Sequence, residues 1–168
     1  MRLVHRPGTG REVLERTGVR SGWSAHCLTT VMSLDPTRPD ECRILVVDDN
    51  RDAADTLVSL LDLFGYAAVA VYDGEHAVLA SEALHPSLIF LDIDMPGMDG
   101  YATATCIRNA ELAPDNAGHA PAELVALTAR NSDADKVLTS AVGFDLRVQK
   151  PIGAKQLCRL AEKACPKH

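Results

Sequence analysis

The sequence predicts an α/β fold with a doubly wound parallel sheet, and three observations support this expectation. Strand-like and helix-like stretches alternate five times after residue 41, which is typical of the units that build a parallel sheet. The strand-like stretches are almost continuously apolar, as expected for strands that helices cover on both faces. Acidic, hydroxyl and basic residues follow several of these strands, at the edge where open sheets of this kind bind ligands.

Five short apolar runs are the expected strands, and most of them end at a polar or turn residue. The first run, "RILVV", leads directly into two adjacent acids. The second leads into Asp73-Gly74, which is ordinary turn chemistry. In chain order, the strands are expected at residues 43–47, 66–72, 87–92, 123–128 and 145–150.

A stretch with the spacing of an amphipathic helix follows each strand. After the first strand, apolar residues recur at helical spacing: Leu57, Leu60, Leu61 and Phe64. Gly65 is expected to end this helix, and Pro86 follows the end of the second. In chain order, the helices are expected at residues 51–65, 74–84, 100–112, 133–143 and 153–165.

The character of the chain changes at about residue 40. Residues 1–40 hold six Arg and four acidic residues, contain several Gly and Pro and show no sustained period. We therefore expect a largely disordered N-terminal extension over residues 1–40 and one folded domain over residues 41–168. In the full chain of 168 residues, 46% are hydrophobic, which is enough for one packed core.

Charge and hydropathy argue against two classes of partner. The formal net charge is −6, whereas direct nucleic-acid binding usually requires a basic face. No apolar run approaches the roughly 20 residues that a membrane-spanning helix needs, and the Arg-rich start has no apolar core of a secretory signal. We therefore expect a cytoplasmic protein without direct contact to nucleic acid or membrane.

The cysteines and histidines show no metal-binding pattern. The five cysteines are an odd number and form no CxxC pair, so we expect thiols in a reducing cytoplasm rather than zinc ligands or a disulfide framework. The histidines of the folded part share no metal-binding spacing either, and we expect them at the surface. The residues concerned are Cys27, Cys42, Cys106, Cys158 and Cys165, and His76, His85 and His119.

Polar residues at four of the five strand ends are the candidate site. They are Asp48 and Asp49 after the first strand, Asp92 at the end of the third, Thr128 at the end of the fourth and Lys150 at the end of the fifth. Each of these alone has an ordinary explanation, such as a helix cap, a turn or a solvated charge. Together they bring three carboxylates, a hydroxyl and an ammonium to one edge of the sheet, and the combination argues for function.

The charges of this group predict a divalent cation. Three carboxylates at close range repel one another unless they are protonated or neutralised, and Lys150 supplies a single positive charge. Ligands that are all oxygen select a hard ion, Mg²⁺ or Mn²⁺, rather than zinc. A carboxylate can act as a nucleophile toward phosphorus, and a lysine can stabilise phosphate oxygens. The residues therefore predict metal-assisted phosphoryl transfer onto an aspartate.

These residues carry a resemblance to a known family. The motifs "VVDDN", "LDIDMPGMDG", "ALTA" and "KP" stand at the expected strand ends. From about Cys42 to Cys165, the chain resembles the receiver domain of two-component response regulators. The resemblance implies a flavodoxin-like (βα)5 fold with strand order 2-1-3-4-5. It covers none of the N-terminal extension.

The resemblance implies a role for each acidic residue at the site. Asp92 would be the phosphoacceptor. Asp49 and Asp92 would bind Mg²⁺ directly, and Asp48 would bind it largely through water. The backbone carbonyl of Asp94 would be a further ligand.

It also implies a phosphate-binding and switching set. Thr128 and Lys150 would contact the phosphoryl group, and Ala129 is small enough to leave room above it. The bond between Lys150 and Pro151 would be cis. The family often carries an aromatic switch residue three places before this lysine, and here that position is Arg147. An arginine there either contacts a partner or is a solvated residue of an edge strand.

The expected function is that of a single-domain response regulator. It would take a phosphoryl group from a sensor histidine kinase or a phosphotransfer histidine, and catalyse only its own phosphorylation and dephosphorylation. Because few residues follow the last helix, we expect output through protein contact, or onward transfer of the phosphoryl group, rather than through a C-terminal output domain. One alternative is a haloacid-dehalogenase-like phosphatase, which also uses an aspartate, Mg²⁺ and a lysine. Another is a receiver that is not phosphorylated and serves as a binding module.

Overall fold

The computed structural model describes residues 43–114, 118–129, 139 and 141–166. The expected extension over residues 1–40 and most of the expected helix over residues 133–143 lie outside this part of the chain. The other nine expected strands and helices lie within it, and each has a counterpart in the structure. The ends of these elements differ from the expected bounds by two residues or fewer.

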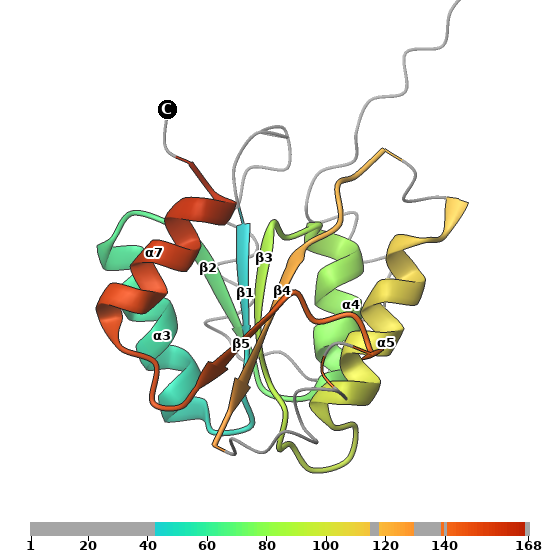
Figure 1. Ribbon diagram of the computed structural model, residues 1–168, viewed down its shortest axis with the longest axis horizontal. Helices are drawn as coiled ribbons and strands as arrows, with labels where there is room; N and C mark the ends of the chain where they lie inside the picture. The colour runs from blue at the N-terminus through green and yellow to red at the C-terminus, as the bar shows by residue number, and fades with distance from the viewer. Residues whose placement is uncertain (1–42, 115–117, 130–138, 140, 167–168) are drawn as a thin grey trace, which may run out of the picture.

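Five parallel strands form one sheet in the order β2-β1-β3-β4-β5. Because every strand runs in the same direction, the carboxyl ends of all five lie at one edge, as the arrows in Figure 1 show. The predicted doubly wound α/β fold and its strand order are confirmed. The strands are β1 (Arg43–Val47), β2 (Ala67–Val71), β3 (Leu88–Asp92), β4 (Glu123–Thr128) and β5 (Leu146–Gln149).

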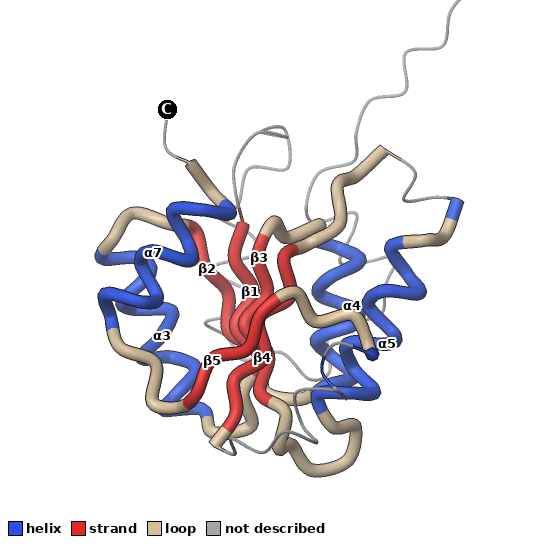
Figure 2. The backbone as a smooth tube through the Cα atoms, in the orientation of Figure 1, coloured by secondary structure: helices blue, strands red, loops and turns tan. Residues whose placement is uncertain are grey.

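Four described helices cover the two faces of the sheet, and Figure 2 shows the strands as a central layer between them. The pairs α3 and α7 lie on one face, and α4 and α5 on the other. The helices are α3 (Arg51–Leu63), α4 (Gly74–Leu84), α5 (Gly100–Glu111) and α7 (Ala154–Ala164). None of the helices in the described ranges is long and apolar enough to cross a membrane.

Two apolar clusters explain why the strands are apolar throughout. Neighbouring residues of a strand point to opposite faces. Ile44 of β1 packs with the cluster that contains Leu57 and Leu157, from α3 and α7. Leu45 packs with the other cluster, which contains Ala80 and Ile107 from α4 and α5. Both faces of each central strand are therefore buried, which requires apolar residues at consecutive positions.

The local signals for the first helix agree with its structure. The side chain of Asn50 caps the start of α3 by accepting a hydrogen bond from the backbone N–H of Ala53 at 3.3 Å. Gly65, which follows the helix, has a φ of 77°, a conformation that glycine adopts without steric cost. Its N–H donates to the carbonyl of Asp62 at 2.8 Å and so closes the last turn.

The cysteines require one correction. Cys106 and Cys158 are free thiols, but Cys165, which is buried at the end of α7, is disulfide-bonded. Its partner is not among the described residues. The expectation of thiols alone is therefore wrong for Cys165. Spacing along the chain could not reveal this bond, because a disulfide depends on two β-carbons that the fold brings within about 4 Å.

Candidate functional site

The carboxyl edge of the sheet brings the predicted acidic residues together. Carboxylate oxygens of Asp48, Asp49 and Asp92 all lie within 4.8 Å of one another. Asp48 and Asp92 are buried, with 1% and 4% of their surfaces exposed, whereas Asp49 faces solvent. This arrangement follows from the topology, because β1 and β3 are neighbours in the sheet and Asp48 directly follows the end of β1.

Lys150 bridges the two buried carboxylates. Its Nζ lies 2.7 Å from Oδ2 of Asp48 and 2.9 Å from Oδ2 of Asp92. The lysine directly follows β5, and its backbone N–H donates to the carbonyl of Thr128 at 2.8 Å. The peptide bond between Lys150 and Pro151 is cis. The ammonium of Lys150, at the end of β5, therefore pairs with the carboxylates of Asp48 and Asp92, at the ends of β1 and β3.

Burial raises the pKa of the Asp92 carboxyl above its ordinary value, because the low-dielectric surroundings disfavour the charged form. The nearby charge of Asp48 raises this pKa further, while the bond to Lys150 opposes the increase. Partial burial lowers the pKa of Lys150, but its bonds to Asp48 and Asp92 outweigh that effect, and the net change is upward. The lysine therefore stays protonated at neutral pH, and Asp92 is a carboxylate that lacks full compensation.

The oxygens of Asp48 are already engaged by the protein. Oδ1 accepts a hydrogen bond from the backbone N–H of Asn50 at 3.0 Å, and Oδ2 accepts one from Lys150. Asp92 accepts a longer bond of 3.3 Å from the N–H of Asp94 on Oδ1. The exposed carboxylate of Asp49 and this weakly bonded oxygen of Asp92 are therefore the groups with the most capacity for a further ligand. Oxygen donors alone fit a hard divalent cation.

The remaining predicted residues differ in their placement. Thr128 is buried at the end of β4, and Ala129, which follows it, is exposed. Asp94 is exposed in the loop after β3. Arg147 pairs in register with Ala126 of β4 and is half-buried on the edge strand β5.

Sequence reasoning missed Gly100 as a residue of the site. Its backbone N–H donates to the carbonyl of Ile93 at 3.0 Å, and a β-carbon at this position would overlap the backbone of Asp92 and Ile93. Asp99 caps the same helix start by accepting a bond from the N–H of Ala102 at 2.8 Å. The absence of a side chain at residue 100 thus allows α5 to begin directly against the backbone of Asp92. The Asp99-Gly100 pair, in which Asp99 caps the helix and Gly100 is its first residue, was the available signal.

Comparison with known proteins places this geometry in a family. The family model described as the response regulator receiver domain matches residues 44–162. A probable transcriptional regulator, ycf27 of Cyanophora paradoxa, is 34% identical over 115 residues, which are 68% of this chain and 44% of that protein. The chain thus spans less than half the length of this relative.

Solved structures show the same fold. One is the co-crystal structure of the Saccharomyces cerevisiae histidine phosphotransfer protein Ypd1 with the receiver domain of its downstream response regulator Ssk1. The match to that structure has a TM-score of 0.68 and 27% sequence identity, and it covers 74% of this chain and 89% of that chain. The chemotaxis protein CheY4 of Vibrio cholerae has a TM-score of 0.65 and 22% identity, with 73% and 98% covered.

The chain therefore belongs to the response regulator receiver domain family. Its described part is a receiver domain of two-component signalling. This assignment leaves no support for the haloacid-dehalogenase-like alternative. The cluster of acids at the carboxyl edge is able to hold a metal ion.

Proposed function

We propose that Asp92 accepts a phosphoryl group from a sensor histidine kinase or a phosphotransfer histidine in an Mg²⁺-dependent reaction. The observation that supports this most directly is the convergence of three carboxylates and the ammonium of Lys150 at the end of β3. A receiver bound to a histidine phosphotransfer protein is among the structural relatives, which supports a donor of this class.

The transfer moves one phosphoryl group between two side chains. A carboxylate oxygen of Asp92 forms a bond to phosphorus while the bond between phosphorus and the donor imidazole nitrogen breaks. The electron pair of that bond stays on the nitrogen, and the donor leaves as neutral imidazole when its other ring nitrogen carries a proton. The raised pKa of Asp92 marks a carboxylate with little stabilisation from solvent, which favours its conversion to an acyl phosphate.

The other side chains stabilise the phosphoryl oxygens and the metal. The Nζ of Lys150 lies 2.9 Å from Oδ2 of Asp92, so its positive charge can stabilise the negative charge of a phosphoryl group bound to Asp92. The hydroxyl of Thr128 donates a hydrogen bond to a phosphoryl oxygen, and the small side chain of Ala129 leaves space for the phosphoryl group. Mg²⁺, when bound, supplies charge neutralisation for the attacking carboxylate and the phosphoryl oxygens. Its ligands would be Asp49, Asp92 and the carbonyl of Asp94, with Asp48 acting through water because both of its oxygens are engaged.

Phosphorylation then changes a protein-binding face. The proposed output face includes β5 and α7, with Arg147 at the position that often carries an aromatic residue. The helix expected at residues 133–143, which would complete this face, lies mostly outside the described residues. Arg147 is half-buried beside β4, so a shift near Thr128 can reach it through the sheet. We propose that the protein acts on no external substrate and catalyses only its own phosphorylation and dephosphorylation.

Incubation with acetyl phosphate and Mg²⁺, followed by intact mass measurement, tests the proposal. We expect one added phosphoryl group on the parent protein, and none on Asp92→Asn or in the presence of EDTA. Asp62→Asn, which changes an exposed aspartate at the far end of α3, is the matched control and should label like the parent. Equal labelling of Asp92→Asn would remove Asp92 from its proposed role. A folded parent that never labels would favour the unphosphorylated binding module.

A further inference from the structure

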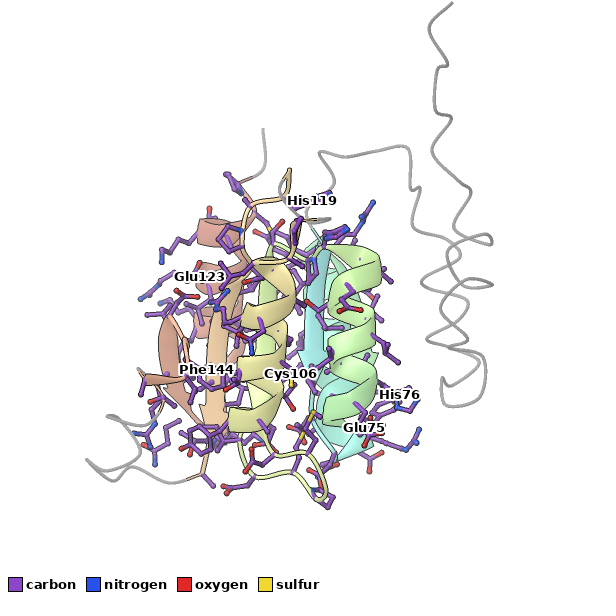
Figure 3. The ribbon with its side chains drawn as sticks, turned by 90° about the vertical axis from the view of Figure 1, so that its right-hand side faces the viewer. Glu75, His76, Cys106, His119, Glu123 and Phe144 are labelled. Atoms are coloured by element: carbon purple, nitrogen blue, oxygen red, sulfur yellow. The ribbon has the colours of Figure 1, made fainter. Side chains whose placement is uncertain are left out.

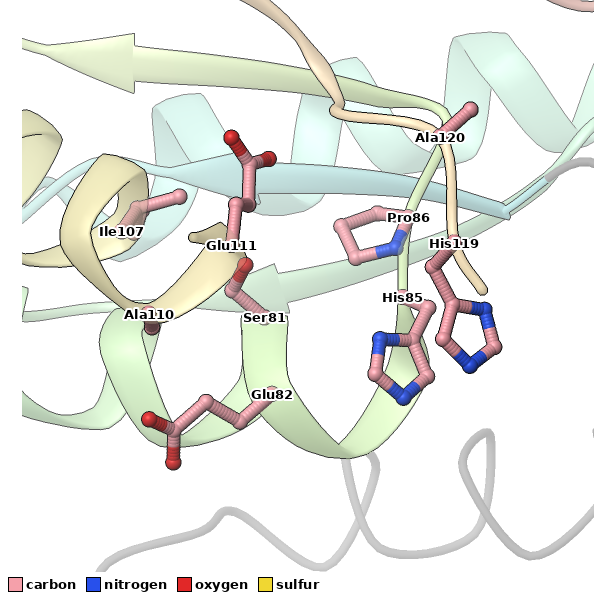
Figure 4. A pocket seen from close by; sticks show the side chains of 9 residues that line it. All are labelled: Ser81, Glu82, His85, Pro86, Ile107, Ala110, Glu111, His119 and Ala120. Carbon is pink, nitrogen blue, oxygen red and sulfur yellow. The ribbon is translucent and has the colours of Figure 1, made fainter. Parts of the chain in front are cut away.

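Two histidine rings stack at the edge of the sheet opposite the phosphorylation site. The rings of His85 and His119 are 3.7 Å apart between centroids and 4° from parallel, and Figure 4 shows them side by side. His85 follows the end of α4, and His119 belongs to the loop that leads into β4. Figure 3 shows His119 at the end of the molecule far from His76, which lies near the start of α4. Two separate elements therefore meet through this ring contact.

The backbone fixes His85 in its position. His85 has a φ of 45°, the left-handed conformation, and its N–H donates to the carbonyl of Ser81 at 3.0 Å to close α4. Pro86, which follows it, is buried and restricts the chain further. Because the backbone is restricted at residue 85 and at the proline that follows, the ring of His85 has a fixed position for stacking with the ring of His119.

The charges around the pair oppose its protonation. Arg43 of β1 donates from a guanidinium nitrogen to the carbonyl of Leu84 at 2.9 Å, so a cation already lies at the end of α4. Glu111 of α5 is engaged with Arg108 at 2.7 Å and with the backbone N–H of Ala122 at 2.8 Å. Glu82 of α4 directs its carboxylate away from the rings (Figure 4). Burial, then His119 and then Arg43 lower the pKa of His85.

The two rings are part of the lining of a small pocket beside α4 and α5. The rest of its lining is mixed, with apolar residues such as Pro86 and Ile107 and polar residues such as Ser81 and Glu111. The two rings are nearly parallel. Because the lone pair of a ring nitrogen lies in the plane of its ring, the lone pairs of two stacked rings do not point at a common position. This arrangement does not suit shared coordination of a metal, and proton binding is the reaction to which the pair is best suited.

We propose that the His85–His119 pair is a pH-sensitive latch that holds the loop at residues 118–122 against the end of α4 and opens when both rings are protonated. Both rings are at the solvent-exposed surface, so water screens the repulsion, but two like charges at the distance of a ring stack still oppose the stacked arrangement. The latch lies at the edge opposite Asp92 and is independent of the proposed phosphoryl transfer.

The sign of the pH effect follows from the lowered pKa of His85. In the window below the ordinary histidine pKa of about 6.5, the unfolded chain binds more protons than the closed state. The closed state is therefore fully stable above this window and loses stability as the pH falls through it. Open forms gain in population on acidification for the same reason.

NMR measurements on the full chain, with EDTA present, test the latch through the hydrogen exchange of two backbone amides at the end of the loop. The backbone N–H of Glu123 donates to Ser87 at 2.9 Å, and that of Ala122 donates to Glu111. We expect His85 to titrate below free imidazole. Between pH 7.5 and pH 5.5, and after correction for intrinsic exchange, we expect amide exchange at these two residues to rise about tenfold.

Three variants separate the latch from a general effect of acid. His119→Phe keeps a ring for stacking but carries no proton, so we expect the titration of His85 to move up toward that of free imidazole and the rise in exchange to disappear. His85→Asn tolerates the left-handed backbone and should also remove the rise. His76→Gln, at the other end of α4, should behave as the parent. Exchange that rises equally in His119→Phe and the parent, or an ordinary titration of His85 in the parent, would overturn the proposal.

Discussion

Asp92 carries its charge at a position that reduces the stability of the fold. Its side chain is buried beside Asp48, and one ammonium, that of Lys150, serves both acids. Burial and the charge of Asp48 raise the pKa of Asp92. Between its ordinary and its folded pKa, the native state binds more protons than the unfolded chain, so stability falls as the pH rises through this window. Functional sites commonly retain such unfavourable charges.

Asp92→Asn should therefore stabilise the metal-free protein. At pH 7.5 in EDTA, we expect a gain of about 0.5–2 kcal/mol in the free energy of unfolding, because the amide removes a buried charge and leaves Lys150 paired with Asp48. The gain should shrink toward pH 4, because the raised pKa of Asp92 lets the native parent take up this proton at a higher pH than the unfolded chain does. Urea unfolding at both pH values measures this. As a control, Glu82→Gln at an exposed position of α4 should stay within about 0.5 kcal/mol of the parent, and a loss of stability in Asp92→Asn at pH 7.5 would contradict the account.

At the scale of elements, the loop between β3 and α5 connects the fold to the site. The start of α5 lies against the backbone of Asp92 because Gly100 has no side chain. The N–H of Gly100 donates to Ile93, and the N–H of Ile93 donates to Leu127 of β4 at 3.1 Å. The position of Asp92 therefore depends on close backbone contacts from a helix and a neighbouring strand.

Gly100→Ala should disturb both stability and phosphorylation. The added methyl group meets backbone atoms that cannot move aside cheaply, so we expect a loss of about 1–3 kcal/mol and slower labelling by acetyl phosphate per folded molecule. Gly118→Ala adds the same group where nothing lies within 4 Å and is the matched control. Thermal unfolding and labelling rates provide the two measurements. Parent-like labelling in a folded Gly100→Ala protein would show that this contact does not position Asp92.

At the scale of the whole molecule, the metal is expected to bind only the folded chain, because its ligands come from β1 and β3. Mg²⁺ at a hundredfold excess over its dissociation constant should raise the free energy of unfolding by about 2.7 kcal/mol. Asp49→Asn should lose most of this gain without a large change in the metal-free protein, because Asp49 is exposed. Thermal scans across a Mg²⁺ series measure the effect. Equal Mg²⁺ stabilisation of the parent and Asp49→Asn would exclude Asp49 as a ligand.

The sequence predicted the types of residue at the strand ends better than their contacts. Asp48, Asp92 and Lys150 could be predicted to share an edge because alternation of strands and helices fixes the direction of every strand. That Lys150 bridges both acids could not be predicted, because no local pattern encodes a contact between residues 102 positions apart. The stack of His85 on His119 was missed for the same reason. Long-range packing decided both contacts.

Chemical location of the phosphoryl group tests the central claim most directly. Borohydride reduces an aspartyl phosphate to homoserine, so the parent protein can be labelled with acetyl phosphate and Mg²⁺, reduced, digested and sequenced by mass spectrometry. We predict homoserine at position 92 in the parent, and none at this position when EDTA replaces Mg²⁺. Homoserine at another aspartate, with position 92 unchanged, would contradict the assignment of Asp92 as the phosphoacceptor.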